Sequence, residues 1–76
     1  MQKVLVLGAG LVARPLVRYL LDKGYGVTCA SRTVSKAEEL LAGHERGEAV
    51  PLDLADEGKL AELIAAHDLA ISLVPP

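Results

Sequence analysis

A glycine-rich turn near the start of the chain constrains the fold more than any other feature of the sequence. The turn, Gly8-Ala9-Gly10-Leu11-Val12-Ala13, follows a short apolar segment and opens a helical pattern. It fits the spacing G-x-G-x-x-G/A. In this spacing the first glycine allows a tight turn, the second lets a pyrophosphate approach the backbone, and the last small residue lets the helix pack on the sheet. Because a helix N-terminus attracts anions, we expect a dinucleotide here. A close-packed turn without a ligand is the alternative.

Four short apolar segments alternate with three helical patterns along the 76 residues. Strands are expected at residues 3–7, 26–31, 48–53 and 68–74. Strands that alternate with helices predict a parallel sheet with right-handed crossovers and the spatial strand order 3-2-1-4. Pro51 cannot donate to a ladder, which suggests that the third strand lies at an edge. The predicted fold class is α/β, with three αβα layers around four strands, as in the first half of a Rossmann fold.

The three helical patterns carry signals for their beginnings and for their buried faces. The first pattern covers residues 11–23. Ser35 and Glu38 have the spacing of a capping box at the start of the second, and Asp56 is the expected N-cap of the third. The stripes expected to face the sheet are Val12, Leu16, Tyr19 and Leu20 in the first helix, Ala37, Leu40 and Leu41 in the second, and Leu60, Leu63 and Ile64 in the third.

The segment after the second predicted strand distinguishes between two nicotinamide cofactors. NAD-binding folds place an acidic residue there, whereas this chain has Ser31-Arg32-Thr33 and no carboxylate between Asp22 and Glu38. An arginine can form a charge-assisted fork on a 2′-phosphate and stack on adenine, and the two hydroxyls add donors. We therefore expect NADP(H) rather than NAD(H). The alternative is that Arg32 is an ordinary solvated loop residue.

Two further strand ends supply candidate ligand contacts. Asp53 ends the third predicted strand, where it could face the adenine amino group or cap the next helix. Ser72, Leu73 and Val74 end the fourth, at the sheet edge where ligands bind in open α/β folds. They are candidates for the ribose and nicotinamide side, and a buried strand end is the alternative.

The remaining titratable and sulfur-containing residues are expected to have structural roles. His44 and His67 lie near helix C-termini, where a histidine interacts well with the helix dipole. No histidine or cysteine pair has zinc spacing, so no metal is expected. Cys29 is expected to be a small core residue. Arg14 can reach a phosphate or form part of a solvated helix face.

Composition and charge exclude several classes of partner. A net charge of −2 without a basic run argues against nucleic acid. The longest apolar runs are far below the length of a membrane span, and the N-terminus has no signal-peptide layout. A single cysteine fits a reducing compartment. The sequence therefore predicts a cytoplasmic protein with no membrane partner.

Three stretches of the chain resemble a known enzyme family. VLVLGAGLVARPLVRYL, TCASRTVSKAEELL and PLDLADEGKLAELIAAHDLAISLVP are similar to the start of the saccharopine dehydrogenases of the NADP-dependent, L-glutamate-forming type. The piece SRTVSKAEELL also resembles shikimate dehydrogenases and glutamyl-tRNA reductases, whereas LDLAD and ISLVP favour the saccharopine family. Pro76 stands where that family more often carries a tyrosine or another larger residue.

The resemblance implies an NADP(H) site and assigns residues to its parts. The residues implied are Gly8, Gly10, Leu11 and Val12 around the pyrophosphate, Ser31, Arg32 and Thr33 at the 2′-phosphate, Asp53 and Leu54 beside the adenine, and Leu73 and Val74 at the ribose. It also implies an oxidoreductase that interconverts saccharopine with glutamate and aminoadipate semialdehyde.

The length of the chain limits what it is expected to do alone. Because the family enzymes are several times longer, residues 1–76 are expected to form the N-terminal part of the NADP-binding domain, without a substrate domain, a catalytic residue or activity of their own. The alternatives are a stand-alone nucleotide-binding or sensing module, or a fragment of another NADP-dependent dehydrogenase such as a shikimate dehydrogenase. An unpaired fourth strand predicts self-association through residues 69–74.

Overall fold

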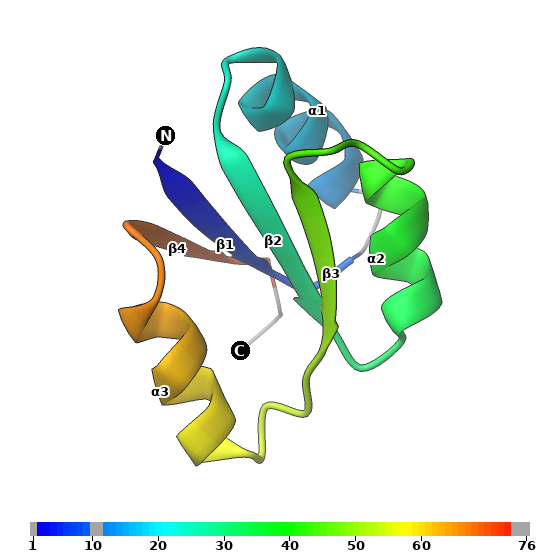
Figure 1. Ribbon diagram of the computed structural model, residues 1–76. Coiled ribbons are helices and arrows are strands. Elements are labelled where there is room, and N and C mark those ends of the chain that lie inside the picture. Colours follow the sequence, from blue (N-terminus) through cyan, green and yellow to red (C-terminus); the bar gives the residue numbers. More distant parts are fainter. Residues whose placement is uncertain (1, 10–11, 74–76) are drawn as a thin grey trace.

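Seven elements alternate along the chain in the computed structural model, which describes residues 2–9 and 12–73. In chain order they are β1 (Lys3–Leu7), α1 (Ala13–Asp22), β2 (Gly26–Ser31), α2 (Val34–Leu41), β3 (Gly47–Pro51), α3 (Glu57–Ala65) and β4 (Leu69–Ser72). The strands form one parallel sheet in the order β3-β2-β1-β4 (Figure 1). The predicted α/β fold class and strand order are therefore confirmed.

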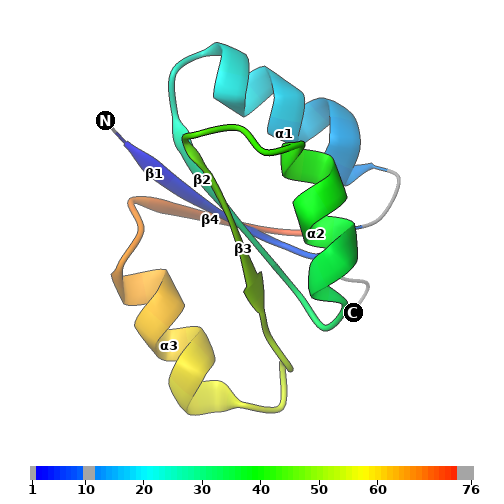
Figure 2. The same cartoon turned by 45° about the vertical axis from the view of Figure 1, so that its right-hand side comes forward.

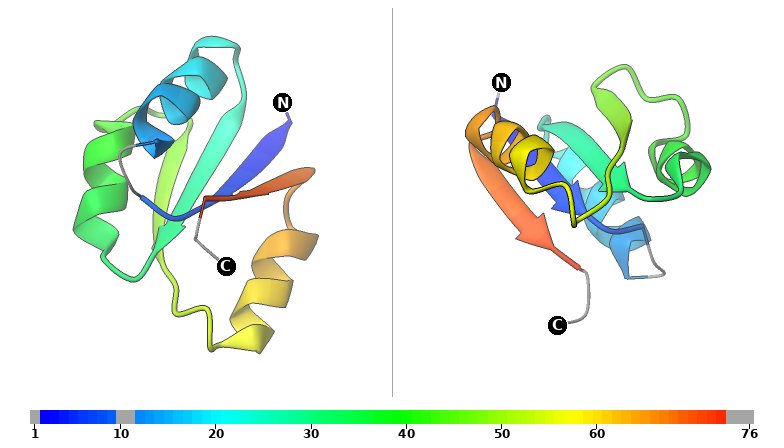
Figure 3. Two further views of the ribbon diagram at one scale, coloured as in Figure 1. Left: turned by 180° about the vertical axis from the view of Figure 1, so that it is seen from behind. Right: turned by 90° about the horizontal axis from the view of Figure 1, so that it is seen from below.

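The helices cover the two faces of the sheet unequally. Figures 1 and 2 show α1 and α2 side by side on one face and α3 alone on the other, and both views of Figure 3 show the same layering. The α1/α2 layer packs on Val4 and Val6 of β1, while α3 lies over Leu5 and Leu7. Successive residues of a strand point to opposite faces, so β1 is buried on both sides and reads as an unbroken apolar run.

The strand at each end of the sheet differs slightly from its predicted range. β3 ends at Pro51, two residues earlier than expected, and β4 covers four residues within the predicted range 68–74, of which Val74 lies outside the described residues. β3 pairs only with β2 among the described strands, which confirms the edge position predicted from Pro51. No helix in the described part of the chain is long and apolar enough to span a bilayer.

The buried face of α1 differs from the predicted stripe. The helix buries Ala13, Val17, Leu20 and Leu21. Leu16 packs partly against this core, whereas Val12 is 70% and Tyr19 is 58% exposed, so the prediction for these two residues was wrong. Each step along a helix turns by about 100°, and the contact with the sheet is centred on Ala13 and Val17, which turns Tyr19 to the solvent.

The N-terminus of α2 also differs from the prediction. Its N-cap is Thr33, in an extended conformation and without a side-chain capping bond, so the capping box predicted for Ser35 and Glu38 does not form. Ser35 lies inside the helix, where its hydroxyl cannot serve the first turn. The predicted inner face is confirmed, because Ala37, Leu40 and Leu41 are all buried.

The N-terminus and most of the inner face of the third helix agree with the prediction. Asp56 caps it as predicted, with Oδ1 accepting from Lys59 N–H at 3.1 Å. Leu60 and Leu63 pack against the sheet, but Ile64 is 46% exposed and its predicted place on the inner face was wrong. Ile64 follows Leu63 by one residue, which turns it about 100° away from the sheet.

The two histidines hold loop and helix ends, as expected of structural residues. His67 Nδ1 lies 2.6 Å from the Leu63 carbonyl, which can only accept, so Nδ1 donates, and Nε2 is hydrogen-bonded to Thr28 Oγ1 at 2.7 Å. His67 thereby joins the end of α3 to β2. His44 Nδ1 accepts from Arg46 N–H at 3.1 Å in the loop before β3.

Candidate functional site

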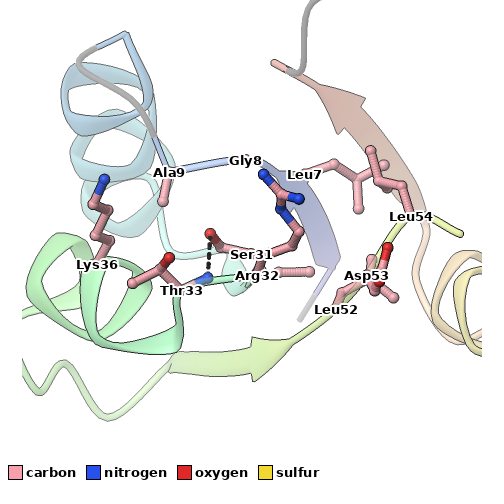
Figure 4. Close-up of a pocket in the computed structure, with 11 residues that line it drawn as sticks. Leu7, Gly8, Ala9, Ser31, Arg32, Thr33, Lys36, Leu52, Asp53 and Leu54 are labelled. Carbon is pink, nitrogen blue, oxygen red and sulfur yellow. Dashed lines mark hydrogen bonds between the residues drawn. The ribbon is translucent and has the colours of Figure 1, made fainter. Parts of the chain in front are cut away.

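A pocket of about 570 Å³ opens where β1, β2 and β3 end (Figure 4). It lies at the carboxyl edge of a parallel sheet, which is where open α/β folds bind ligands. The residues that line it are Leu7, Gly8, Ala9, Ala30, Ser31, Arg32, Thr33, Lys36, Leu52, Asp53 and Leu54. The structure therefore brings together three segments that the sequence analysis selected separately: the glycine turn, Ser31-Arg32-Thr33 and Asp53-Leu54.

Backbone hydrogen bonds tie the loops around the pocket to one another. Gly8 N–H donates to the Ala30 carbonyl, and Leu52 N–H donates to the Ser31 carbonyl, each at 2.9 Å. Each bond continues the ladder one step past the end of a strand. The loops after β1, β2 and β3 are consequently held at fixed positions relative to each other.

The glycine turn begins in a backbone conformation that favours glycine. Gly8 has a φ of +108°, which side-chain-bearing residues rarely adopt, so its place at the first position of the motif has a direct structural reason. The first turn of α1 contains no acidic residue that could occupy its amide groups. Val12 is exposed at the N-cap of α1 but does not line the pocket, and Gly10 and Leu11 lie outside the described residues.

The segment after β2 supplies the positive charge of the pocket. Ser31 Oγ accepts from Thr33 N–H at 3.3 Å, which gives the segment a defined turn before α2. Arg32 is exposed on the pocket rim, and Lys36 lines the same pocket from the first turn of α2 (Figure 4). The pocket thus presents two cationic side chains next to the N-terminus of a helix, an arrangement suited to a phosphate group.

Sequence reasoning missed Lys36 as a pocket residue. The spacing to Thr33 could have identified it, because residues three apart on a helix share a face and Thr33 was already a predicted site residue. Ala9 and Leu52 also line the pocket and were not predicted as site residues. Leu52 is buried and lines the pocket just after β3.

Asp53 lies on the pocket rim rather than at a helix cap. Its Oδ1 accepts from Ala55 N–H at 2.9 Å, and the cap of α3 is Asp56. This geometry excludes the helix cap as a role for Asp53, and the contact with adenine stays a prediction. Leu54, which follows it, is 40% exposed and lines the same side of the pocket.

The end of β4 does not contribute to this pocket. Leu73 N–H donates to the Leu7 carbonyl at 2.9 Å, and the Leu73 side chain packs against the core on the α1 side. Neither Leu73 nor Ser72 lines the pocket, and Val74 lies outside the described residues. Arg14, the other cation considered for a phosphate, is exposed on α1 and is likewise absent from the lining.

Cys29 lies in the core below the glycine turn. It is fully buried, as predicted, and burial raises the pKa of its thiol because the charged thiolate is poorly solvated there. Within residues 2–9 and 12–73, no three histidine, cysteine or acidic side chains are grouped in a way that could hold a metal ion.

Comparisons with known proteins agree with this geometry. The family model described as the saccharopine dehydrogenase NADP binding domain matches residues 4–76. A saccharopine dehydrogenase [NADP(+), L-glutamate-forming] from Schizosaccharomyces pombe is 43% identical over 76 residues, which are 99% of this chain. A shikimate dehydrogenase (NADP(+)) from Carboxydothermus hydrogenoformans is 38% identical over 74 residues, or 97% of this chain.

A solved structure shows the same fold as part of a longer chain. Apo saccharopine dehydrogenase (L-Glu forming) from Saccharomyces cerevisiae superposes with a TM-score of 0.89 at 36% identity, over 99% of this chain. The 76 residues span 17% of that chain and 17% of the Schizosaccharomyces pombe protein. The fold, the pocket and the match over residues 4–76 lead to one conclusion: this chain belongs to the saccharopine dehydrogenase family, as an NADP-binding domain of the Rossmann type.

Proposed function

We propose that the pocket at the ends of β1, β2 and β3 holds the adenosine 2′-phosphate half of NADP(H). The observation that carries this proposal is the joint presence of Arg32 and Lys36 in a pocket whose other wall is the glycine turn. Arg32 offers a planar fork and Lys36 a point charge, and the two chemistries suit a dianionic 2′-phosphate. The missing acid after β2 supports the preference for NADP(H) over NAD(H), since a carboxylate there would repel the phosphate.

The other residues are assigned to parts of the cofactor by their positions in the fold. Gly8, Gly10, Leu11 and Val12 are proposed to surround the pyrophosphate at the start of α1, and Ser31 and Thr33 to add hydroxyl donors at the 2′-phosphate. Asp53 and Leu54 are proposed to flank the adenine from the opposite rim. Leu73 and Val74, at the end of β4, are proposed to contact the ribose of the cofactor half that extends beyond this pocket.

We also propose the reaction of the protein to which this domain contributes. It is an NADP-dependent oxidoreductase that acts on the CH–NH bond of saccharopine and forms L-glutamate and aminoadipate semialdehyde. The printed names of the relatives support NADP(+), saccharopine and the formation of L-glutamate. The saccharopine dehydrogenases among the relatives are about six times longer than this chain, whose share of them is 16–17%. The residues described here bind and orient the cofactor, and the 76-residue chain by itself is proposed to bind without turnover. The single free thiol suits the reducing cytoplasm that we propose as its location.

Calorimetric titration of NADPH and NADH into the 76-residue chain tests the cofactor assignment. Arg32→Ala should weaken NADPH binding by about 1.5–3 kcal/mol, the range for a hydrogen bond to a charged group, and leave NADH almost unchanged. Lys36→Ala should act in the same direction with a smaller effect. Arg18→Ala removes an exposed cation from α1, outside the pocket, and serves as the matched control. Equal losses for NADPH and NADH in Arg32→Ala would refute the assignment.

A further inference from the structure

The buried thiol of Cys29 contacts the glycine turn, and this contact has a geometric consequence. Cys29 lies in β2 with no exposed surface, and its Sγ is 3.8 Å from the carbonyl oxygen of Gly8. The two residues are 21 positions apart and meet because β1 and β2 are in register, with Val6 opposite Cys29. We propose that Cys29 is a positioning residue for cofactor binding, an inference that rests on the proposed function.

Both polar groups of Gly8 are held by β2. Its N–H donates to the Ala30 carbonyl at 2.9 Å, and its carbonyl accepts from the Cys29 thiol. No peptide bond in the described residues is cis, so the Gly8 carbonyl and the following Ala9 N–H point in opposite directions. Because the carbonyl faces the buried thiol, the Ala9 N–H is turned away from the core.

The orientation of this peptide matters for an anionic ligand. Gly8 and Ala9 both line the pocket, and among the residues that the structure describes no acceptor bonds to Ala9 N–H. Rotation of this peptide changes ψ of Gly8 and φ of Ala9, and the lack of a Cβ on Gly8 makes such a rotation easier than at other residues. The thiol thus favours the orientation of the Gly8–Ala9 peptide in which the Ala9 N–H can donate to a phosphate in the pocket. Burial also keeps the thiol in its protonated, donating form.

The experiment compares two probes that differ in their reach across the pocket. NADPH engages the glycine turn through its pyrophosphate, whereas adenosine 2′-phosphate engages only the Arg32 and Lys36 side. Cys29→Val fills the space without a donor and should weaken NADPH about three- to tenfold, the range for one neutral hydrogen bond, with adenosine 2′-phosphate unchanged. Cys29→Ser keeps a donor and should retain most of the NADPH affinity. In NMR spectra, the Ala9 amide should shift on NADPH binding in the native chain and not in Cys29→Val.

Matched variants separate positioning from stability. Val6→Ala removes volume from the same core cluster without touching the turn, so it should lower the melting temperature and leave the ratio of the two affinities unchanged. Cys29→Ala replaces Cys29→Val as the donor-free variant if the latter does not fold. The inference about Cys29 is overturned if a folded donor-free variant keeps the native ratio of NADPH affinity to adenosine 2′-phosphate affinity. It is also overturned if NADPH shifts the Ala9 amide resonance in that variant as much as in the native chain. Failure of the native chain to bind either probe would instead overturn the proposed function.

Discussion

Gly47, the first residue of β3, is predicted to be intolerant of even one added methyl group. A Cβ built at this position would lie 2.8 Å from Leu41 Cδ2, 3.1 Å from Leu41 Cβ and 3.2 Å from Leu41 Cγ. The optimal separation of two non-bonded carbon atoms is about 3.5–4.0 Å, so all three contacts are too short. Leu41 is only 3% exposed and lies in the α2 layer of the core, where it has little room to move aside.

The size of the effect follows from two opposing terms. Overpacking of a core site costs about 1–3 kcal/mol. Replacing glycine by alanine also restricts the unfolded chain, which stabilises the fold by about 0.4–1 kcal/mol. We therefore expect Gly47→Ala to lower the free energy of unfolding by about 1–2 kcal/mol, which corresponds to a loss of roughly 5–15 °C in melting temperature for a domain of this size.

A second glycine supplies the control. Gly58 lies in the first turn of α3, and a Cβ there would meet only Asp56 Oδ1, at an ordinary 3.8 Å. Gly58→Ala should stabilise the chain by about 0.5 kcal/mol, because alanine is the better helix former. Both variants are measured by thermal and urea unfolding followed by circular dichroism. If Gly47→Ala is as stable as Gly58→Ala, Leu41 adapts freely and the packing argument is refuted.

The helix caps and the sheet edge give two more predictions. Asp56→Ala should destabilise the chain by about 1 kcal/mol in urea unfolding, since it removes the cap of α3, whereas Ser35→Ala should change stability by less than about 0.5 kcal/mol. A large effect of Ser35→Ala would contradict the cap geometry of α2. The outer edge of β4 is unpaired among the described strands, and Leu69 on it is 54% exposed, so the isolated chain should self-associate in sedimentation experiments and Leu69→Lys should suppress this. A native chain that stays monomeric at high concentration would refute the edge argument.

Much of the fold could be predicted because its signals are local. The strand ranges come from short apolar runs, and the glycine turn and the segment Ser31-Arg32-Thr33 come from spacing alone. Strand order then follows from the handedness of the crossovers, and this places both segments at one edge of the sheet. The pocket confirms that Gly8, Arg32 and Asp53 lie together.

The errors concern features that depend on tertiary contact. A helical period indicates that a stripe is buried but does not give its centre, so Tyr19 and Ile64 were misplaced by one residue around their helices. The capping box at Ser35 failed because α2 starts earlier, at Val34, on a backbone that Thr33 already holds extended. The contact between Cys29 and Gly8 depends on the register of two strands, and no pattern within either strand encodes it.

Strand register has a wider consequence for this site. Leu7 lies opposite Ala30 on one side and Ser72 on the other, and Ser31 lies opposite Pro51. A slip of two residues would keep every apolar side chain on its own face, so the hydrophobic core discriminates poorly against it. The same slip would move a strand end by about 6.6 Å and separate Arg32 from the glycine turn. The backbone hydrogen bonds that Gly8 and Leu52 donate to the neighbouring strand ends would re-form with other carbonyls after such a slip, so they do not discriminate against it either. The geometry of the ligand site is thus more sensitive to strand register than the hydrophobic core is.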